Sequence, residues 1–291
     1  MKRLSYIFFG TTHFSKAILE NLLQKGYLPK AIFSIPEYFS ISYAQEKVKN
    51  CNFFDFSSLA REYNIPFYWV ESPTNTLLSY KDKIQEYEVD FFLVANWYYK
   101  IPYQIYTLSK MGAFGFHNSL LPKYAGSAPL VWAMIKGERE SGVTLFKMNE
   151  EMDCGDIISQ ESFVIDFKDS INEVLKKAEK IAIQMSLDLF CKPIVFTEQK
   201  GETKYYPPRN PEDGEIDLNL SAEDLYNFIR AQSFPYPGAF IKTRDGKRLI
   251  IEKAYIDSRI PNNPSFDNPA GGGGRFSRFF APLQTTSKKV A

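Results

Sequence analysis

Cysteine, histidine and net charge are all scarce in this sequence of 291 residues. The cysteines Cys51, Cys154 and Cys191 are odd in number and form no CxxC pair. This argues against a disulfide framework and against a zinc site, and we expect no bound metal. With only two histidines, His13 and His117, any chemistry that needs an imidazole has two candidates.

The chain carries 35 Lys and Arg against 34 Asp and Glu, a net charge of +1. Proteins that bind nucleic acid usually carry a clear basic excess, so we expect no nucleic-acid partner. No run of about 18 apolar residues is present, so we expect no membrane span. The short N-terminal apolar stretch leads directly into a helical pattern, which favours a first strand over a signal peptide and a cytoplasmic location.

Apolar residues, in contrast, make up 44% of the chain and occur in short runs separated by helical patterns. Alternation of strand and helix is typical of an α/β fold with a mostly parallel sheet. Strands are expected at residues 4–9, 30–35, 66–70, 89–95, 113–116, 142–148 and 157–165. Helices are expected at residues 14–23, 57–63, 128–135 and 170–189.

After Lys200 the composition changes. A loop rich in Pro, a helix at 221–230 and a hairpin around Arg244-Asp-Gly246 predict a small α+β extension. We therefore expect a catalytic domain at 1–200 and an extension at 201–258. Residues 259–291, with a run of four glycines, are linker-like in composition and predict a disordered or non-native tail.

His117 directly follows the expected strand 113–116 and precedes the polar pair Asn118-Ser119. Ligands of open α/β sheets bind at the carboxyl ends of strands, so this histidine is a candidate for the site. A strand-end histidine bonded only to backbone is the alternative, and spacing alone leaves both open. Asp153 lies in an acidic turn, which by itself is more typical of a solvated loop.

Three segments change this balance: His117-Asn-Ser-Leu-Leu-Pro-Lys-Tyr-Ala-Gly126, Gly137-Glu-Arg-Glu-Ser-Gly-Val-Thr144 and Met152-Asp-Cys-Gly-Asp-Ile157. In this order they resemble the motifs H-x-S-L-L-P-x-Y-x-G, G-E-x-x-x-G-V-T and D-x-G-D-I of the folate-dependent formyltransferases. The resemblance covers about residues 4 to 250 and is closest to the sugar N-formyltransferases. It implies a Rossmann-like formyltransferase fold and 10-formyltetrahydrofolate as formyl donor.

The catalytic set that the resemblance implies is an Asn, a His two residues later and an Asp. His117 and Asp153 match, but Gly115 stands at the Asn position and cannot supply an amide. Asn96, after the strand 89–95, and Asn118 are the substitutes. Adjacent residues of an extended segment point to opposite faces, so we prefer Asn96, for which Gly115 leaves room. The alternative is that Asn96 only caps its strand.

Further site residues are expected on both sides of this centre. Trp97, Tyr98, Tyr99 and Asp156 are predicted to contact the folate, although the three rings could equally be core. Thr11 and Thr12 precede a helix, whose N-terminus favours an anion such as a phosphate, but an ordinary turn fits them as well. The remaining residues predicted to bind the acceptor are Lys123, Tyr124, Arg209 and Tyr236.

The acceptor is the least constrained part of the prediction. The resembling tRNA enzyme carries a further barrel domain, and few residues remain for one between Lys204 and Asp257. The glycinamide ribonucleotide enzyme ends near the catalytic domain. We therefore predict formylation of a nucleotide-linked amino deoxysugar for surface polysaccharide. Methionyl-tRNA formyltransferase is the alternative, and a weakly catalytic folate- or sugar-nucleotide-binding protein is a second one; a homodimer is left open.

Overall fold

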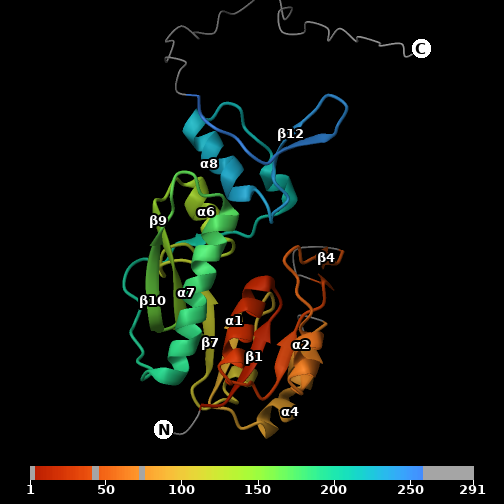
Figure 1. The fold of residues 1–291 in the computed structure, drawn as a ribbon, viewed down its shortest axis with the longest axis vertical. Helices are drawn as coiled ribbons and strands as arrows, with labels where there is room; N and C mark the ends of the chain where they lie inside the picture. Colours follow the sequence, from red (N-terminus) through yellow and green to blue (C-terminus); the bar gives the residue numbers. More distant parts are fainter. Residues whose placement is uncertain (1–3, 41–45, 72–75, 258–291) are drawn as a thin grey trace, which may run out of the picture. The chain divides into compact units, whose positions relative to one another are not determined.

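The computed structural model describes residues 4–40, 46–71 and 76–257. The tail predicted at 259–291 lies outside them. All described helices and strands belong to one compact unit that ends at Tyr255 (Figure 1). None of the helices in the described part is long and apolar enough to cross a membrane.

The unit is built around a seven-stranded sheet in the order β10-β9-β7-β6-β1-β2-β5. Its strands are β1 (Tyr6–Gly10), β2 (Ile32–Ser34), β5 (Phe67–Trp69), β6 (Phe91–Ala95), β7 (Ala113–His117), β9 (Glu140–Lys147) and β10 (Ile157–Val164). The strands from β5 to β7 are parallel, whereas β9 is antiparallel to both β7 and β10. The predicted α/β fold with a mostly parallel sheet is confirmed.

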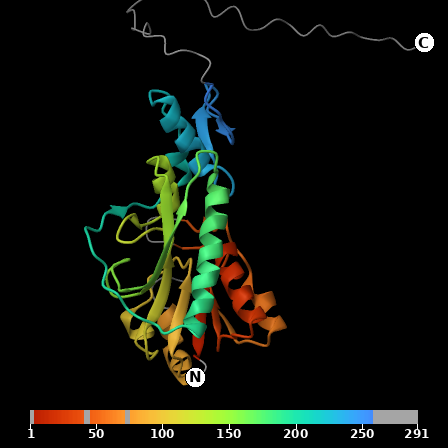
Figure 2. The same cartoon turned by 60° about the vertical axis from the view of Figure 1, so that its left-hand side comes forward.

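Helices cover both faces of this sheet because its central strands are apolar on both sides. Tyr6 and Phe8 of β1 face a core built with α1, α2, α6 and α7, while Ile7 and Phe9 face a core built with α3, α4 and α5. The helices are α1 (His13–Gln24), α2 (Phe56–Glu62), α3 (Thr76–Ser79), α4 (Lys81–Glu86), α5 (Tyr103–Tyr106), α6 (Pro129–Ile135) and α7 (Ile171–Cys191). Figure 2 shows α7 running along the sheet beside α1.

The chain after α7 forms a separate two-stranded sheet with the segment after β7 before it forms the extension. The two-residue strand β11 (Tyr205–Tyr206) pairs in parallel with β8 (Ala125–Gly126). A 3-10 helix (Pro211–Gly214), α8 (Ala222–Gln232) and the hairpin of β12 (Ala239–Lys242) and β13 (Arg248–Ile251) follow, and α8 packs on α6 (Figure 1). The predicted helix and hairpin are confirmed. The β8–β11 pair and the short pair of β3 (Tyr38–Phe39) and β4 (Val48–Lys49) were not predicted.

Asp90 ties three segments together at the amino edge of the sheet, directly before β6. Its Oδ2 accepts hydrogen bonds from the backbone N–H and the hydroxyl of Ser5, both at 2.8 Å, and its Oδ1 accepts one from Lys110 Nζ at 2.8 Å. Burial alone would raise the pKa of this carboxyl, but these bonds outweigh it and lower the pKa to about 2.

We predict that Asp90→Asn lowers the free energy of unfolding at pH 7 by roughly 2 kcal/mol, because each unit of pKa shift is worth about 1.4 kcal/mol. The folded pKa lies below the unfolded value of 3.8. The contribution is therefore complete above about pH 5 and is lost as the pH falls through about 2. Urea unfolding at pH 7, 4 and 2.5 should show the gap between wild type and variant closing, with exposed Asp82→Asn as the control. A gap that stays constant down to pH 2.5 would contradict this account.

Candidate active site

The carboxyl ends of β1, β6 and β7 bring the predicted polar residues to one edge of the sheet. Gly10 pairs with Ala95, and Val94 pairs with Gly115, so the three strands end at nearly the same level. Thr11 follows β1, Asn96 follows β6, and His117 is the last residue of β7. This edge is where parallel sheets bind ligands.

The His117 ring is buried, with only 8% of the residue exposed, and each of its nitrogens has a defined neighbour. Nε2 lies 2.8 Å from the Tyr124 carbonyl oxygen. A carbonyl can only accept, so Nε2 carries the hydrogen. Nδ1 lies 3.6 Å from Asp153 Oδ2. Nδ1 is therefore the nitrogen with the free lone pair, and it faces the Asp153 carboxylate.

Asp153 is held in a left-handed backbone conformation, with φ of 56°. Gln199 Nε2 fixes this turn by donating to the carbonyl oxygens of Asp153 at 2.8 Å and Gly155 at 2.7 Å. A Cβ at position 155 would lie 1.6 Å from the Lys147 carbonyl oxygen, so only glycine fits there. This explains the D-x-G spacing, because the close approach of β9 to the turn aims Asp153 at the histidine.

One backbone segment holds both members of the pair. The Tyr124 carbonyl accepts from His117, and the Gly126 N–H donates to Asp153 Oδ2 at 2.8 Å. We predicted that Tyr124 binds the acceptor; in the structure its hydroxyl donates to Glu138 Oε1 at 2.7 Å. Burial, and then this bond, raise the pKa of the phenol. The role of its carbonyl was not predicted, because a backbone group leaves no trace in the sequence.

The two candidate asparagines occupy different surroundings. Asn96 Nδ2 donates to the Thr12 hydroxyl at 3.3 Å, a long bond, and its φ of 46° is left-handed. Asn118 is half-buried, and its Oδ1 is buried without a hydrogen-bond partner. A Cβ at Gly115 would meet Met148 Cγ at 3.2 Å and Sδ at 3.3 Å. The space that we expected Gly115 to leave for Asn96 is thus taken by a thioether, and nothing in the sequence pointed to Met148.

Of the aromatic residues after β6, two lie against the core. The Trp97 ring packs edge-on to Phe9 at 5.3 Å between ring centroids, with its Nε1 buried and unbonded. Tyr99 is 7% exposed, and burial raises its pKa to about 12. Tyr98 is 46% exposed and donates to Asn50 Oδ1 at 3.2 Å. Tyr98 is thus the ring of the three that is most accessible to a ligand.

The other predicted contacts are spread around the site. Thr11 and Thr12 are fully buried; Thr11 Oγ1 accepts from Asn50 Nδ2 at 2.8 Å, and Thr12 caps α1. The side chains of Lys123 and Asp156 are exposed. Arg209 lies over the Trp132 ring at 4.8 Å and donates to Gln232 Oε1 at 2.6 Å, so Trp132 of α6 and Gln232 of α8 already bind its guanidinium. Burial raises the pKa of the half-buried Tyr236 to about 12.

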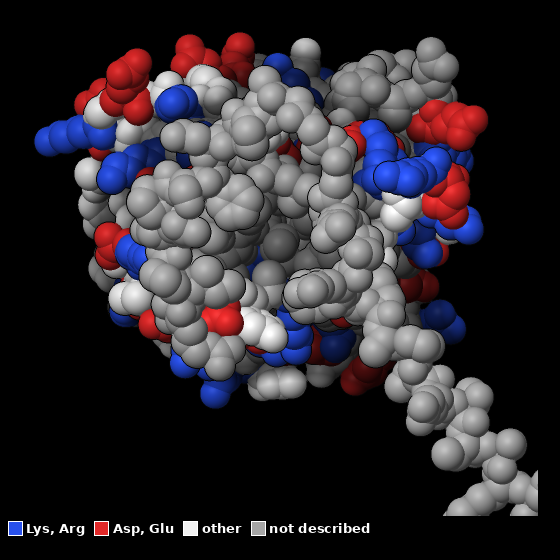
Figure 3. All heavy atoms as spheres, turned by 90° about the horizontal axis from the view of Figure 1, so that it is seen from above, with Lys and Arg blue, Asp and Glu red and all other residues white. Residues whose placement is uncertain are grey.

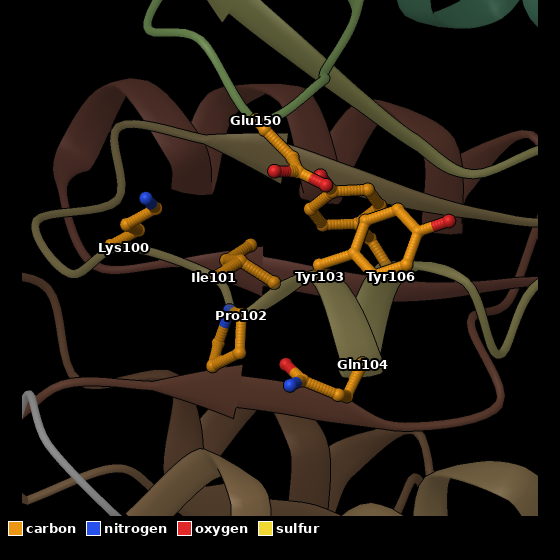
Figure 4. A pocket seen from close by; sticks show the side chains of 7 residues that line it. All are labelled: Lys100, Ile101, Pro102, Tyr103, Gln104, Tyr106 and Glu150. Carbon is orange, nitrogen blue, oxygen red and sulfur yellow. The ribbon is translucent and has the colours of Figure 1, made fainter.

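A hollow of about 370 Å³ opens between α5 and the turn after β9 (Figure 4). Lys100, Tyr103, Gln104, Tyr106 and Glu150 supply its polar lining. In Figure 4 the carboxylate of Glu150 lies above the tyrosine rings. A second hollow of about 630 Å³ shares Tyr103, Tyr106 and Glu150 with it. We did not predict this lining, because its members come from two segments that only the fold brings together.

The second hollow also connects this region to the catalytic strand. Met148 lines it, and the same side chain packs against the position of Gly115, two residues before His117. Lys110, Met111 and Gly112, which directly precede β7, line it as well, so this hollow reaches β7 at its amino end and not at the carboxyl end that carries His117.

Residues 2–187 match the sequence model of the family described as Formyl transferase, and residues 209–276 match the one described as Formyl transferase, C-terminal domain. The chain belongs to the formyl transferase family. The predicted family, and with it the class of enzyme, an N-formyltransferase, are confirmed. The second match extends past Asp257, beyond the residues that the structure describes.

Two relatives are similar to this formyl transferase in sequence. The bifunctional polymyxin resistance protein ArnA of Wigglesworthia glossinidia brevipalpis is 35% identical over 219 residues, which are 72% of this chain and 33% of ArnA. This chain thus spans about a third of that relative. Methionyl-tRNA formyltransferase of Lactobacillus gasseri is 31% identical over 258 residues, which are 86% of this chain and 78% of that enzyme.

Two solved structures share the fold. A 4-N formyltransferase from Francisella tularensis has a TM-score of 0.64 and 18% identity, and the match covers 87% of this chain and 99% of that one. An N-formyltransferase from Helicobacter canadensis, in complex with folinic acid and dTDP-3-aminofucose, has a TM-score of 0.57 and 19% identity over 78% of this chain and 80% of that one. Folinic acid, a formyl-folate, is thus a ligand of the Helicobacter canadensis protein.

We predict that His117→Ala and Asp153→Asn each lower kcat at least about 100-fold, because each removes proton-holding or charge-stabilising capacity. Asp153→Asn keeps the size of the side chain and its acceptor for Gly126, so the fold should persist. Circular dichroism and single-turnover formyl transfer measure the two effects, with Asp82→Asn on α4 as the charge-matched control. Near-normal kcat in either variant would remove that residue from the catalytic set.

Asn96 gives a separate prediction. Its amide has one N–H bonded weakly to Thr12 and a second one for a ligand. We expect Asn96→Ala to lower kcat by roughly 10–1,000-fold with little change in KM, as for a bond made mainly in the transition state. Asn118→Ala should matter less. A larger loss in Asn118→Ala would show that the half-buried Asn118 amide, and not Asn96, replaces the missing donor.

Proposed function

We propose that this protein transfers a formyl group from 10-formyltetrahydrofolate to the amine of a nucleotide-linked amino deoxysugar. The observation that carries the proposal is the buried His117–Asp153 pair at the carboxyl edge of a formyl transferase sheet, with Nε2 of the histidine tied to a carbonyl and Nδ1 facing the carboxylate.

The arrangement suits attack of an amine on a formyl carbon. The attack places negative charge on the formyl oxygen and leaves an excess proton on the nitrogen. The pair can hold that proton on Nδ1, beside Asp153, while the protonated ring adds positive charge near the oxyanion. Release of the folate nitrogen then needs a proton back, which the same nitrogen supplies. The two groups thus take up and return one proton in each turnover.

The formyl donor binds, in this proposal, at the carboxyl edge of the sheet beside the His117–Asp153 pair. Tyr98 follows β6 at this edge, and its ring, in a residue that is 46% exposed, can contact a flat heterocycle. The hollows along α5 do not serve this purpose, because Tyr106 is buried in the core and Lys110 and Gly112 place the second hollow at the amino end of β7.

Charge favours a small acceptor. The net charge of the chain is +1, and on the part of the molecule that Figure 3 shows in colour, basic and acidic side chains are interspersed. A tRNA substrate would favour a continuous basic surface. The Helicobacter canadensis relative is in complex with dTDP-3-aminofucose, a nucleotide-linked amino sugar. Such a sugar serves as a precursor of surface polysaccharide in this proposal.

Methionyl-tRNA is the second candidate acceptor. Two observations favour it: the match of residues 209–276 to the C-terminal domain of formyl transferases, and the 31% identity with the Lactobacillus gasseri enzyme. This C-terminal match removes part of the argument from chain length that we drew from the sequence. The two acceptors differ in the salt dependence of their binding, which separates them in an assay.

We predict that, with 10-formyltetrahydrofolate, nucleotide-linked amino sugars including dTDP-3-aminofucose are formylated with a kcat/KM at least about 100-fold above that for initiator methionyl-tRNA. Mass spectrometry of the products and filter assays at 50 and 200 mM salt measure this, with His117→Ala as the blank. Salt-sensitive tRNA binding followed by formylation would instead establish the second candidate. Folate binding without transfer to either acceptor would support a weakly catalytic binding protein.

A further inference from the structure

The segment that holds the catalytic pair, residues 124–128, has a strained backbone that is not stable without contacts from other parts of the fold. Tyr124, Gly126 and Ala128 have φ angles of 56°, 95° and 52°, all in the left-handed region. For the two residues that are not glycine this conformation costs about 1 kcal/mol or more, and it persists only when neighbouring structure imposes it. The segment therefore needs an external support.

That support is β11, from the connection between the two matched family regions. Tyr205 and Tyr206 pair with Ala125 and Gly126, and the Tyr206 carbonyl accepts from the Ser127 N–H at 3.0 Å. A Cβ on Gly126 would lie 2.4 Å from this carbonyl oxygen, so the two backbones are in close contact. The Tyr206 ring stacks on that of Tyr124 at 4.8 Å between centroids.

The neighbouring residue of β11 reaches the other half of the pair. The Tyr205 hydroxyl donates to the Met152 carbonyl at 2.9 Å, and the Cys154 Sγ lies 2.9 Å from the Tyr205 hydroxyl oxygen. Because the single phenolic hydrogen is used on Met152, the thiol donates to the phenol. Tyr205 thus contacts the residues immediately before and after Asp153, whose own φ is left-handed.

We propose that Tyr205 and Tyr206 are positioning residues for catalysis, through which the connection to the C-terminal region sets the geometry of the His117–Asp153 pair. Tyr206 holds the segment whose carbonyl fixes Nε2 of His117, and Tyr205 holds the turn that aims Asp153. The catalytic pair is complete only when β11 is in place. The catalytic consequence rests on the proposed formyl transfer, but the geometric one does not.

The tautomer of His117 tests the geometric consequence without turnover. The chain has only two histidines, so the exposed His13 is an internal reference in 15N-detected imidazole spectra. In the wild type, neutral His117 should carry its proton on Nε2. Tyr206→Ala should produce a mixture of the Nε2 and Nδ1 tautomers at His117 and leave His13 unchanged, and Tyr206→Phe, which keeps the ring, should restore the single tautomer. An unchanged His117 in Tyr206→Ala overturns the role of Tyr206.

A double-mutant cycle tests whether Tyr205 acts through Asp153. We expect Tyr205→Phe to lower kcat about 10-fold with both KM values within about 2-fold of wild type, because a small misplacement of the catalytic groups affects the transition state most. In the Asp153→Asn background the same change should have an effect below about 2-fold. Tyr255→Phe, at a tyrosine that is 88% exposed, is the matched control.

The outcomes separate the two proposals. Equal losses in both backgrounds, or a fall in Tm with unchanged kcat, show that Tyr205 is only structural and overturn its positioning role. A wild type that formylates no acceptor contradicts the proposed function, while the His117 tautomer still decides whether β11 sets the geometry of the pair.

Discussion

The three-residue backbone of Tyr124–Gly126 is the constraint on which the site depends. Its carbonyl fixes which nitrogen of His117 carries hydrogen, and its N–H fixes one oxygen of Asp153. The side chains of His117 and Asp153 are thereby positioned by one rigid segment, although the two residues lie far apart along the chain. Backbone dipoles need no reorganisation when charge develops, so such an anchor suits a reaction that creates charge and removes it again.

Much of the fold was predictable because the dominant signals are local. Continuous apolar runs gave β1, β6 and β7, and the capping pattern at Ser221 gave the start of α8. The antiparallel direction of β9 was not predictable, because an apolar strand has the same pattern in either direction. The pairing of β8 with β11 involves two residues on each side and has no period to detect. It is a product of tertiary packing.

In the site, too, the residues in motifs were predictable, whereas the contacts that depend on tertiary packing were not. His117 and Asp153 follow from motifs, and the structure brings them within 3.6 Å. The sequence also showed that Gly115 lacks an amide. It could not show that Met148 fills the space beside Gly115, because that contact depends on how the end of β9 lies across β7. Likewise, the burial of Trp97 and Tyr99 depends on packing against residues such as Phe9 and Phe39.

The thioether of Met148 bears on which group stabilises the oxyanion when Gly115 supplies no amide. A methionine sulfur accepts hydrogen bonds weakly and donates none, so the face of β7 before His117 offers no side-chain donor to an oxyanion. Nε2 of His117 is committed to the Tyr124 carbonyl, and the Gly126 N–H is committed to Asp153. We therefore expect stabilisation from the charge of the protonated ring and from a donor on the neighbouring strand, where Asn96 keeps one N–H beyond its long bond to Thr12. Because β7 lacks this donor, stabilisation of the oxyanion depends more strongly on protonated His117. The position of Asp153 beside Nδ1 is therefore the geometry that the rest of the site has to maintain.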